Sequence, residues 1–144
     1  MKALLCEALG PAETLVIRDL PEPKPGPGEI AIRVTAAALN FFDTLVIQGR
    51  YQVKPPLPFS PSAECAGVVS AVGDGVTDWR VGERVAAWLG HGAAREIVVA
   101  PTEAAIRIPD KLSDHQAAGL FVTYGTAMHG LIQRGEIKPG ETLA

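Results

Sequence analysis

Glycine and proline divide this chain into short apolar segments, and this division restricts the folds that it can adopt. The 144 residues include 15 glycines and 12 prolines. They lie between short apolar runs and do not gather in one low-complexity block. Both residues interrupt regular backbone hydrogen bonding and favour turns. The pattern is typical of many short strands joined by tight turns.

The apolar runs between these turns predict the strands. Residues 29–35 show the clearest alternation, because Ile30, Ile32 and Val34 alternate with small or polar residues, so this strand buries one face. Its expected partner is 67–72, which is followed by a turn at 73–75. Further strands are expected at 14–18, 83–88, 96–100 and 105–108.

The character of the sequence changes at Ser113. Ser113 and Gln116 have the spacing of a capping box, which predicts the start of a helix that runs to about Gly135. The glycines and β-branched residues between 119 and 125 predict a break in it. Residues 138–141 indicate a turn, and 142–144 read as the first residues of a strand. A strand at this position predicts that the chain is the front part of a longer protein.

The charge and the cysteine content of the chain argue against a nucleic-acid partner, a membrane partner and an oxidising compartment. The chain has 13 basic and 16 acidic residues, a net charge of −3, and its basic residues are scattered, so we expect neither a nucleic-acid nor a membrane partner. Residues 1–10 form neither a secretory signal nor a membrane span. Cys6 and Cys65 lie in apolar surroundings and are expected to be buried reduced thiols, which fits the cytoplasm.

Glu64 stands out because it precedes Cys65 at the edge of a strand that reads as buried. A carboxylate beside Ala63 and Ala66 is costly unless it is paired, and Arg84 is the expected partner from local sequence. Two roles stay open for Glu64, which are to line a functional cleft or to hold the fold together. Cys65 is expected to be a small core residue.

Other polar side chains have structural interpretations from their local sequence. Asn40 fits the N-cap of a short helix, with Asp43 in the first turn of that helix. Tyr51 fits a half-exposed packing residue, and Thr126 an ordinary helix residue. The histidines at 91 and 129 have no carboxylate at triad spacing, so surface or packing roles are favoured over acid/base catalysis.

Several separated stretches share their order and spacing with one known family. They are ALNFFDT (38–44) with GRY (49–51), AECAGVV (63–69), VGDGV (72–76), VGERV (81–85), TAMHGL (126–131) and IKPGE (137–141). With these stretches the chain resembles the N-terminal portion of a medium-chain dehydrogenase/reductase, of the zinc-independent quinone oxidoreductase type that includes zeta-crystallin.

The resemblance implies a mainly β fold with a few helices. Residues 1–112 would form a GroES-like, partly open β-barrel that binds substrate, and residues 113–144 a helical linker and the start of a Rossmann domain. The Gly-x-Gly-x-x-Gly motif of such a domain does not occur in the sequence, and in the family it would begin just after Ala144. The 144-residue chain alone is therefore expected to be inactive.

The resemblance also implies an activity and its residues. The full-length protein would be a cytoplasmic homodimer that transfers hydride from NADPH, or alternatively NADH, to a quinone or an enone. Asn40 and Tyr51 would be catalytic, Asn40 and Thr126 would contact the cofactor, and Asp43 and Glu64 would support them. Leu45 stands where some family members carry a tyrosine, so the preferred acceptor does not follow from the resemblance.

A zinc site is not expected. In the zinc alcohol dehydrogenases that resemble this chain, the ligand positions fall on Asn40, Ala63 and Val122. Catalytic zinc needs three protein ligands drawn from cysteine, histidine and carboxylate, and alanine and valine side chains bind no metal ion. A relative of the zinc alcohol dehydrogenases is therefore a weaker alternative.

A second alternative is a stand-alone GroES-like binding or assembly module without catalytic activity. Such a module would have a self-complementary interface and a long mobile polar loop. Four prolines stiffen residues 53–61, and the linker of 113–141 would have no role in such a module. Both observations favour the oxidoreductase.

Overall fold

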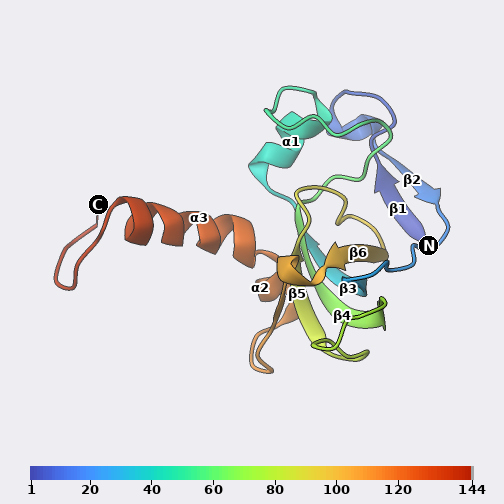
Figure 1. Cartoon of the computed structure of the whole chain (residues 1–144). Coiled ribbons are helices and arrows are strands. Elements are labelled where there is room, and N and C mark those ends of the chain that lie inside the picture. Colours follow the sequence, from blue (N-terminus) through green and yellow to red (C-terminus); the bar gives the residue numbers. More distant parts are fainter. Residues whose placement is uncertain (144) are drawn as a thin grey trace.

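The computed structural model describes residues 1–143, which form two antiparallel sheets and several short helices (Figure 1). One sheet pairs β1 with β2, and the other has the strand order β6-β3-β4-β5-β7. The strands are β1 (Lys2–Leu5), β2 (Val16–Asp19), β3 (Glu29–Ala38), β4 (Glu64–Val72), β5 (Arg84–Trp88), β6 (Ile97–Pro101) and β7 (Ala105–Arg107).

The helices lie between the strands and at the C-terminal end. They are η1 (Ala12–Thr14), α1 (Phe41–Ile47), η2 (Thr102–Ala104), α2 (Asp114–Ala118), η3 (Leu120–Tyr124), α3 (Gly125–Met128) and η4 (His129–Arg134). The last three, of which η3 and η4 are π-helical, run on as one rod that extends away from the sheets (Figure 1). We call this rod, residues 120–134, the projecting helix. None of the helices within residues 1–143 has the length and apolar character needed to cross a membrane.

The pairing of β3 with β4 forms the centre of the larger sheet, as the sequence predicts. Ile30 lies opposite Val72, and Val34 lies opposite Gly67. A Cβ atom on Gly67 would lie 2.1 Å from the carbonyl oxygen of Arg33, so only glycine allows the two strands to approach this closely.

The main core is formed mostly by residues of the five-stranded sheet. Its fully buried members include Ile30, Ile32, Val69 and Val85. Each such side chain stabilises the fold by roughly 1.5–3 kcal/mol through burial alone. The expected buried reduced thiols are confirmed, since both cysteines are free and buried, and burial raises the pKa of Cys65 to about 12.

The sheets form a partly open barrel, as expected. The β1-β2 ribbon joins the segment before β6 through a bridge between Ala3 and Arg95 and a hydrogen bond from Leu4 N to Ala94 O (2.9 Å). Strands β6 and β7 are the two ends of the five-stranded sheet and do not pair with each other. The chain is mainly β with a few helices, and its barrel does not close.

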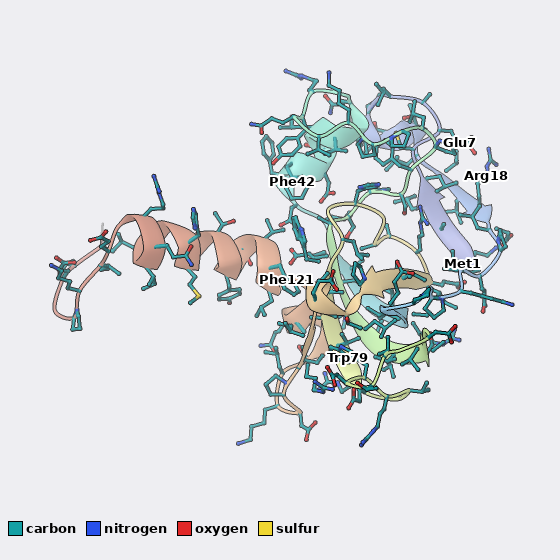
Figure 2. The ribbon with its side chains drawn as sticks, in the orientation of Figure 1. Met1, Glu7, Arg18, Phe42, Trp79 and Phe121 are labelled. Atoms are coloured by element: carbon teal, nitrogen blue, oxygen red, sulfur yellow. The ribbon has the colours of Figure 1, made fainter. Side chains whose placement is uncertain are left out.

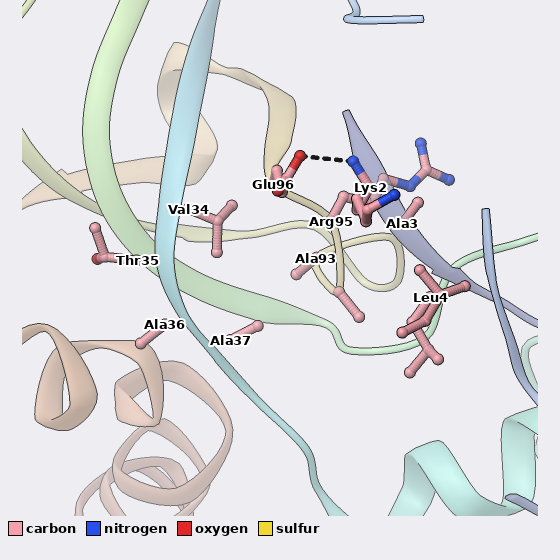
Figure 3. A pocket seen from close by; sticks show the side chains of 12 residues that line it. Lys2, Ala3, Leu4, Val34, Thr35, Ala36, Ala37, Ala93, Arg95 and Glu96 are labelled. Atoms are coloured by element: carbon pink, nitrogen blue, oxygen red, sulfur yellow. Dashed lines mark hydrogen bonds between the residues drawn. The ribbon is translucent and has the colours of Figure 1, made fainter. Parts of the chain in front are cut away.

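An open hollow of about 430 Å³ lies where the ribbon meets β3 (Figure 3). Ala36 and Ala37 of β3 line one side of it, and the segment 93–96 lines another. The backbone N–H of Lys2 donates to Glu96 Oε2 (2.6 Å) across the junction. None of the site residues predicted from the sequence lines this hollow.

Several strand predictions differ from the structure. Strand β3 runs past the predicted 29–35 to Ala38, and β4 begins at Glu64, before the predicted 67–72. The strand expected at 14–18 begins at Val16, because residues 12–14 form the 3₁₀ turn η1, in which Leu15 N donates to Ala12 O (3.1 Å). Strand β1 was not predicted, since four residues carry too little alternation. Thr142 and Leu143 are not in a strand, and Ala144 lies outside the described residues.

The helical part follows the prediction at its start and divides at the expected break. Gln116 N donates to Ser113 Oγ (3.3 Å), and Ser113 N donates to Gln116 Oε1 (3.1 Å), so the capping box is confirmed. The helix that it starts ends at Ala118, and Gly119 separates it from the projecting helix. The predicted helical segment of 113–135 is therefore divided at the start of the predicted break, 119–125.

Candidate active site

Glu64 lies at the start of β4 and is fully buried, with 0% of its surface exposed. Its carboxylate accepts a hydrogen bond from Asn40 Nδ2 (3.0 Å) at one oxygen, and bonds from Phe121 N (2.8 Å) and Val122 N (3.1 Å) at the other. The first amides of a helix have no partner within it and carry partial positive charge, so a carboxylate stabilises them. Glu64 thereby joins the start of the projecting helix to the barrel.

Arg84 does not pair with Glu64, so that prediction was wrong. The β4–β5 register places Arg84 opposite Val68 and Glu64 opposite Trp88, which puts the two charged groups at different ends of the strands. Arg84 instead donates to Asp114 Oδ1 (2.5 Å) and to the carbonyl oxygen of Leu112 (2.7 Å). It holds α2 against the sheet.

Asn40 occupies the N-cap position of α1, as predicted from sequence. Its backbone N–H donates to Asp43 Oδ2 (2.8 Å). Its side-chain amide donates to Glu64 Oε1 (3.0 Å). The Asn40 side chain therefore connects α1 to Glu64.

Asp43 is 5% exposed and lies in the first turn of α1, as expected. Its second oxygen accepts from Ser62 N (2.9 Å), and Ser62 has a left-handed backbone with φ +71°. The Ser62 hydroxyl donates to the carbonyl oxygen of Ala38 (2.8 Å). Burial raises the pKa of Asp43, against the lowering effect of its backbone hydrogen bonds, and the charge of Glu64 raises it further. Asp43 fastens α1 to the segment that leads into β4.

An open cavity of about 490 Å³ lies between α1, the loops after α1 and β5, and the base of the projecting helix. Figure 2 labels Phe42 on α1 and Phe121 at the base of the projecting helix, the two elements that flank this cavity. We call it the aromatic cavity, and it is lined by Phe42, Val46, Tyr51, Val53, Pro55, Trp88, Gly90, His91, Phe121, Val122 and Thr126.

The aromatic cavity brings together some of the residues predicted from sequence. Tyr51 and Thr126 both line it, although 75 positions separate them in the chain. The Tyr51 ring stacks on Phe42 with 5.3 Å between centroids and 30° between planes. Asn40 and Glu64 do not line the cavity, but Glu64 holds the backbone amides of two residues that do, Phe121 and Val122.

His91 lines the cavity as well, although sequence reasoning favoured a surface or packing role for it. The signal that could have found it is the sequence Gly90-His91-Gly92, because glycines on both sides of a residue favour a tight turn. In the structure both glycines have positive φ, +73° and +101°. Burial lowers the pKa of His91, and the nearby charge of Arg95 lowers it further. His129, by contrast, is exposed on the projecting helix, as expected.

The three positions that the family resemblance assigns to zinc ligands lie around Glu64. Asn40 and Val122 both donate to its carboxylate, and Ala63 precedes it in the chain. Within residues 1–143, no three histidine, cysteine or acidic side chains are grouped so that they could hold a metal ion.

Comparison with known proteins supports this picture of the fold. The family model of the alcohol dehydrogenase GroES-like domain matches residues 26–110. The chain belongs to this family. The chain is 37% identical to the human synaptic vesicle membrane protein VAT-1 homolog over 99% of its length. It is 38% identical to the quinone oxidoreductase-like protein 2 homolog of Nematostella vectensis, also over 99% of the chain. These matches cover only 37% and 39% of the two relatives.

Solved structures with the same fold include quinone oxidoreductases. The enzyme of Pseudomonas syringae pv. Tomato DC3000 has a TM-score of 0.89 and 39% identity, over 97% of this chain and 43% of that one. The quinone oxidoreductase of Thermus thermophilus, also solved in complex with NADPH, has a TM-score of 0.81 and 37% identity, over 98% and 42%. The resemblance to this type of medium-chain dehydrogenase/reductase is confirmed.

Proposed function

We propose that the GroES-like domain is the acceptor-binding part of a zinc-independent oxidoreductase that transfers hydride from NADPH to a quinone or an activated alkene, with NADH as the alternative donor. The observation that carries this proposal is the aromatic cavity, in which Tyr51 and Thr126 face an apolar space. Relatives named quinone oxidoreductase support the reaction class.

The chemistry of the cavity suits a flat, apolar acceptor. Aromatic and aliphatic side chains form most of its lining, and an aromatic face such as Tyr51 stacks well on a planar ring. The Tyr51 hydroxyl is proposed to donate to the acceptor oxygen that gains negative charge, an interaction that strengthens as the charge develops. Stacking on Phe42 fixes the plane of the Tyr51 ring before an acceptor binds.

The remaining predicted residues are proposed to act around this cavity. Asn40 was predicted from sequence to be catalytic and to contact the cofactor. Its bond to Glu64 supports a positioning role at the cavity wall. Glu64 would fix Phe121 and Val122, and Asp43 would fix the start of α1. Thr126 is proposed to contact the nicotinamide end of the cofactor, which supplies the hydride when it is bound.

The projecting helix is proposed to lead into the nucleotide-binding domain, with the division between the two domains near residue 112. Tyr124, Met128 and Ile132, spaced four residues apart on one face of this helix, are 69%, 63% and 53% exposed. A continuous apolar stripe of this kind is normally covered. The relatives are more than twice as long as this chain, and a second domain of that length would cover the stripe. From the family resemblance, the longer protein is proposed to be a cytoplasmic homodimer.

The test combines the intact mass of the natural gene product with NADPH oxidation by 1,4-benzoquinone in the presence of a chelator. We expect a product about twice the present length, with activity that resists the chelator. Replacing Tyr51 by Phe should lower kcat/KM about tenfold to a hundredfold, because one hydrogen bond to the developing charge is lost. The control is Glu103→Gln, at an exposed position outside the aromatic cavity, which should leave kcat/KM unchanged.

Two results would contradict the proposal. A folded natural product that ends at residue 144 and binds no NADPH would favour the binding or assembly module. Activity that is lost with the chelator and restored by zinc would favour a relative of the zinc alcohol dehydrogenases.

A further inference from the structure

His91 is held inside the aromatic cavity by its own loop. The loop after β5 turns through Gly90 (φ +73°) and Gly92 (φ +101°), a backbone region that favours glycine. The result is that His91 lines the aromatic cavity together with Tyr51, and also lines an adjacent hollow of about 440 Å³ that Arg95 lines as well. The side chain is therefore placed by local backbone geometry.

The His91 ring has a fixed orientation and free polar atoms. It packs against the edge of Phe59, with 6.2 Å between centroids and 88° between planes, and Phe59 is only 2% exposed. Within residues 1–143, no hydrogen bond involves a ring nitrogen of His91, and neither nitrogen is among the fully buried polar atoms that lack a partner. A half-buried polar group that faces an apolar cavity is stabilised only when water or a ligand completes its hydrogen bonds.

The charge of the ring suits a neutral ligand. Burial and the positive charge of Arg95 both lower the pKa of His91, so the imidazole is neutral near pH 7, with one donor and one acceptor nitrogen. A neutral imidazole donates a hydrogen bond to a carbonyl oxygen without attracting anions.

We propose that His91 determines acceptor specificity by giving the second of two hydrogen bonds to a dicarbonyl acceptor, the first coming from Tyr51. A 1,4-quinone has two carbonyl oxygens at opposite ends of its ring, whereas an enone has one. The two side chains come from different loops around one cavity. The site therefore prefers quinones to enones. This inference rests on the proposed function for the class of acceptor, and it narrows that class.

Calorimetric titration of the 144-residue chain with two neutral ligands tests the inference. Tetramethyl-1,4-benzoquinone has two carbonyl oxygens and no open ring position for thiols to attack, and 3,5,5-trimethylcyclohex-2-enone has one carbonyl oxygen. In His91→Phe, which keeps a ring against Phe59, quinone affinity should fall about fivefold to tenfold, as expected for one lost hydrogen bond. Enone affinity should change less than twofold.

Two further variants separate hydrogen bonding from packing. His91→Gln retains a donor and should keep more of the quinone affinity than His91→Phe. His129→Phe, the same substitution on the exposed projecting helix, should change neither affinity. Equal losses for quinone and enone in His91→Phe, unchanged quinone affinity in that variant, or no quinone binding to the unaltered chain would each overturn the inference.

Failure of the inference and failure of the proposed function give different results. His91-dependent quinone binding in a full-length protein that does not oxidise NADPH would retain the inference and overturn the proposed function. Quinone reduction that is equally efficient in full-length His91→Phe would overturn the inference and leave the proposed function intact.

Discussion

At the residue scale, Glu64 carries the most demanding interactions of the candidate site. Its carboxylate has no exposed surface and accepts three hydrogen bonds, one from the Asn40 side chain and two from the backbone of the projecting helix. All of these groups are donors, so only an acceptor with two oxygens can satisfy them together. Glu64 is therefore a structural connection between barrel and helix.

Replacing Glu64 by Gln should lower the free energy of unfolding by about 1–3 kcal/mol, because the new NH₂ group would face a backbone or amide donor and leave it unpaired. Urea denaturation monitored by tryptophan fluorescence measures the change. The control is Glu103→Gln at an exposed position, which should stay within about 0.5 kcal/mol of the unaltered chain. Equal stability of the two variants would show that the hydrogen bonds of Glu64 contribute nothing.

Asp43 predicts a measurable dependence of stability on pH. Its pKa is raised in the folded state above its usual value of 3.8, so in the window just above 3.8 the folded chain binds more protons than the unfolded chain. The contribution of Asp43 to stability therefore falls as pH rises through this window. Carboxylates in ion pairs, such as Asp114, have lowered pKa values. Their contribution to stability therefore increases as pH rises.

The difference between the unaltered chain and Asp43→Asn isolates this contribution. Free energies of unfolding measured from about pH 4 to pH 7 should show that the advantage of the unaltered chain over the variant shrinks with rising pH. An advantage that grows with pH would mean that the hydrogen bonds from Asn40 and Ser62 outweigh the burial of the carboxylate.

At the element scale, β4 shows how one small residue permits a strand pairing. Gly67 lies within β4, beside a register shift in its pairing with β3. Any side chain there would meet the backbone of Arg33. Because a backbone carbonyl in a central sheet cannot move as a flexible side chain does, the strands would have to separate.

Gly67→Ala should lower the free energy of unfolding by about 3 kcal/mol, at the upper end of overpacking costs. The same substitution at Gly130, whose Cβ would meet no atom within 4 Å, should instead stabilise the chain by about 0.5–1 kcal/mol, because alanine favours a helix over glycine. Thermal unfolding followed by circular dichroism compares the two variants. A Gly67→Ala protein as stable as the unaltered chain would contradict the close approach of β3 and β4.

At the scale of the whole molecule, the barrel and the projecting helix differ in how they are held. Helix α2 packs Ala117 and Ala118 against Ala66 and Ala86 of the sheet. Beyond the bonds to Glu64, the projecting helix is largely exposed and lies away from the barrel (Figure 1). Barrel and projecting helix should therefore differ in local stability.

Amide hydrogen exchange should report this difference. The amides of β3 and β4 should exchange only through global unfolding, whereas those of residues 125–134 should exchange at least about a hundredfold faster, because they open without disturbing the core. Mass spectrometry of peptides after timed labelling measures both regions. Equal protection would show that the projecting helix is covered in solution, for example by a second copy of the chain.

The sequence by itself determined the features that depend on local order. Alternation in 29–35, the glycines and prolines at the turns, and the spacing of Ser113 and Gln116 were enough to predict the central strand pair, the turns and the start of α2, because these signals act between neighbouring residues. The apolar neighbours of Glu64 also made its need for a partner predictable, although not the identity of that partner.

Only the tertiary structure decided which residues meet. The register of β4 and β5 separates Arg84 from Glu64, and the path of the chain brings the base of the projecting helix to Glu64 across more than fifty residues. The same path brings His91 and Tyr51 to one cavity, whose lining does not include Asn40. Contacts between distant segments depend on strand register and packing, and the local pattern of residues does not encode either of these by itself.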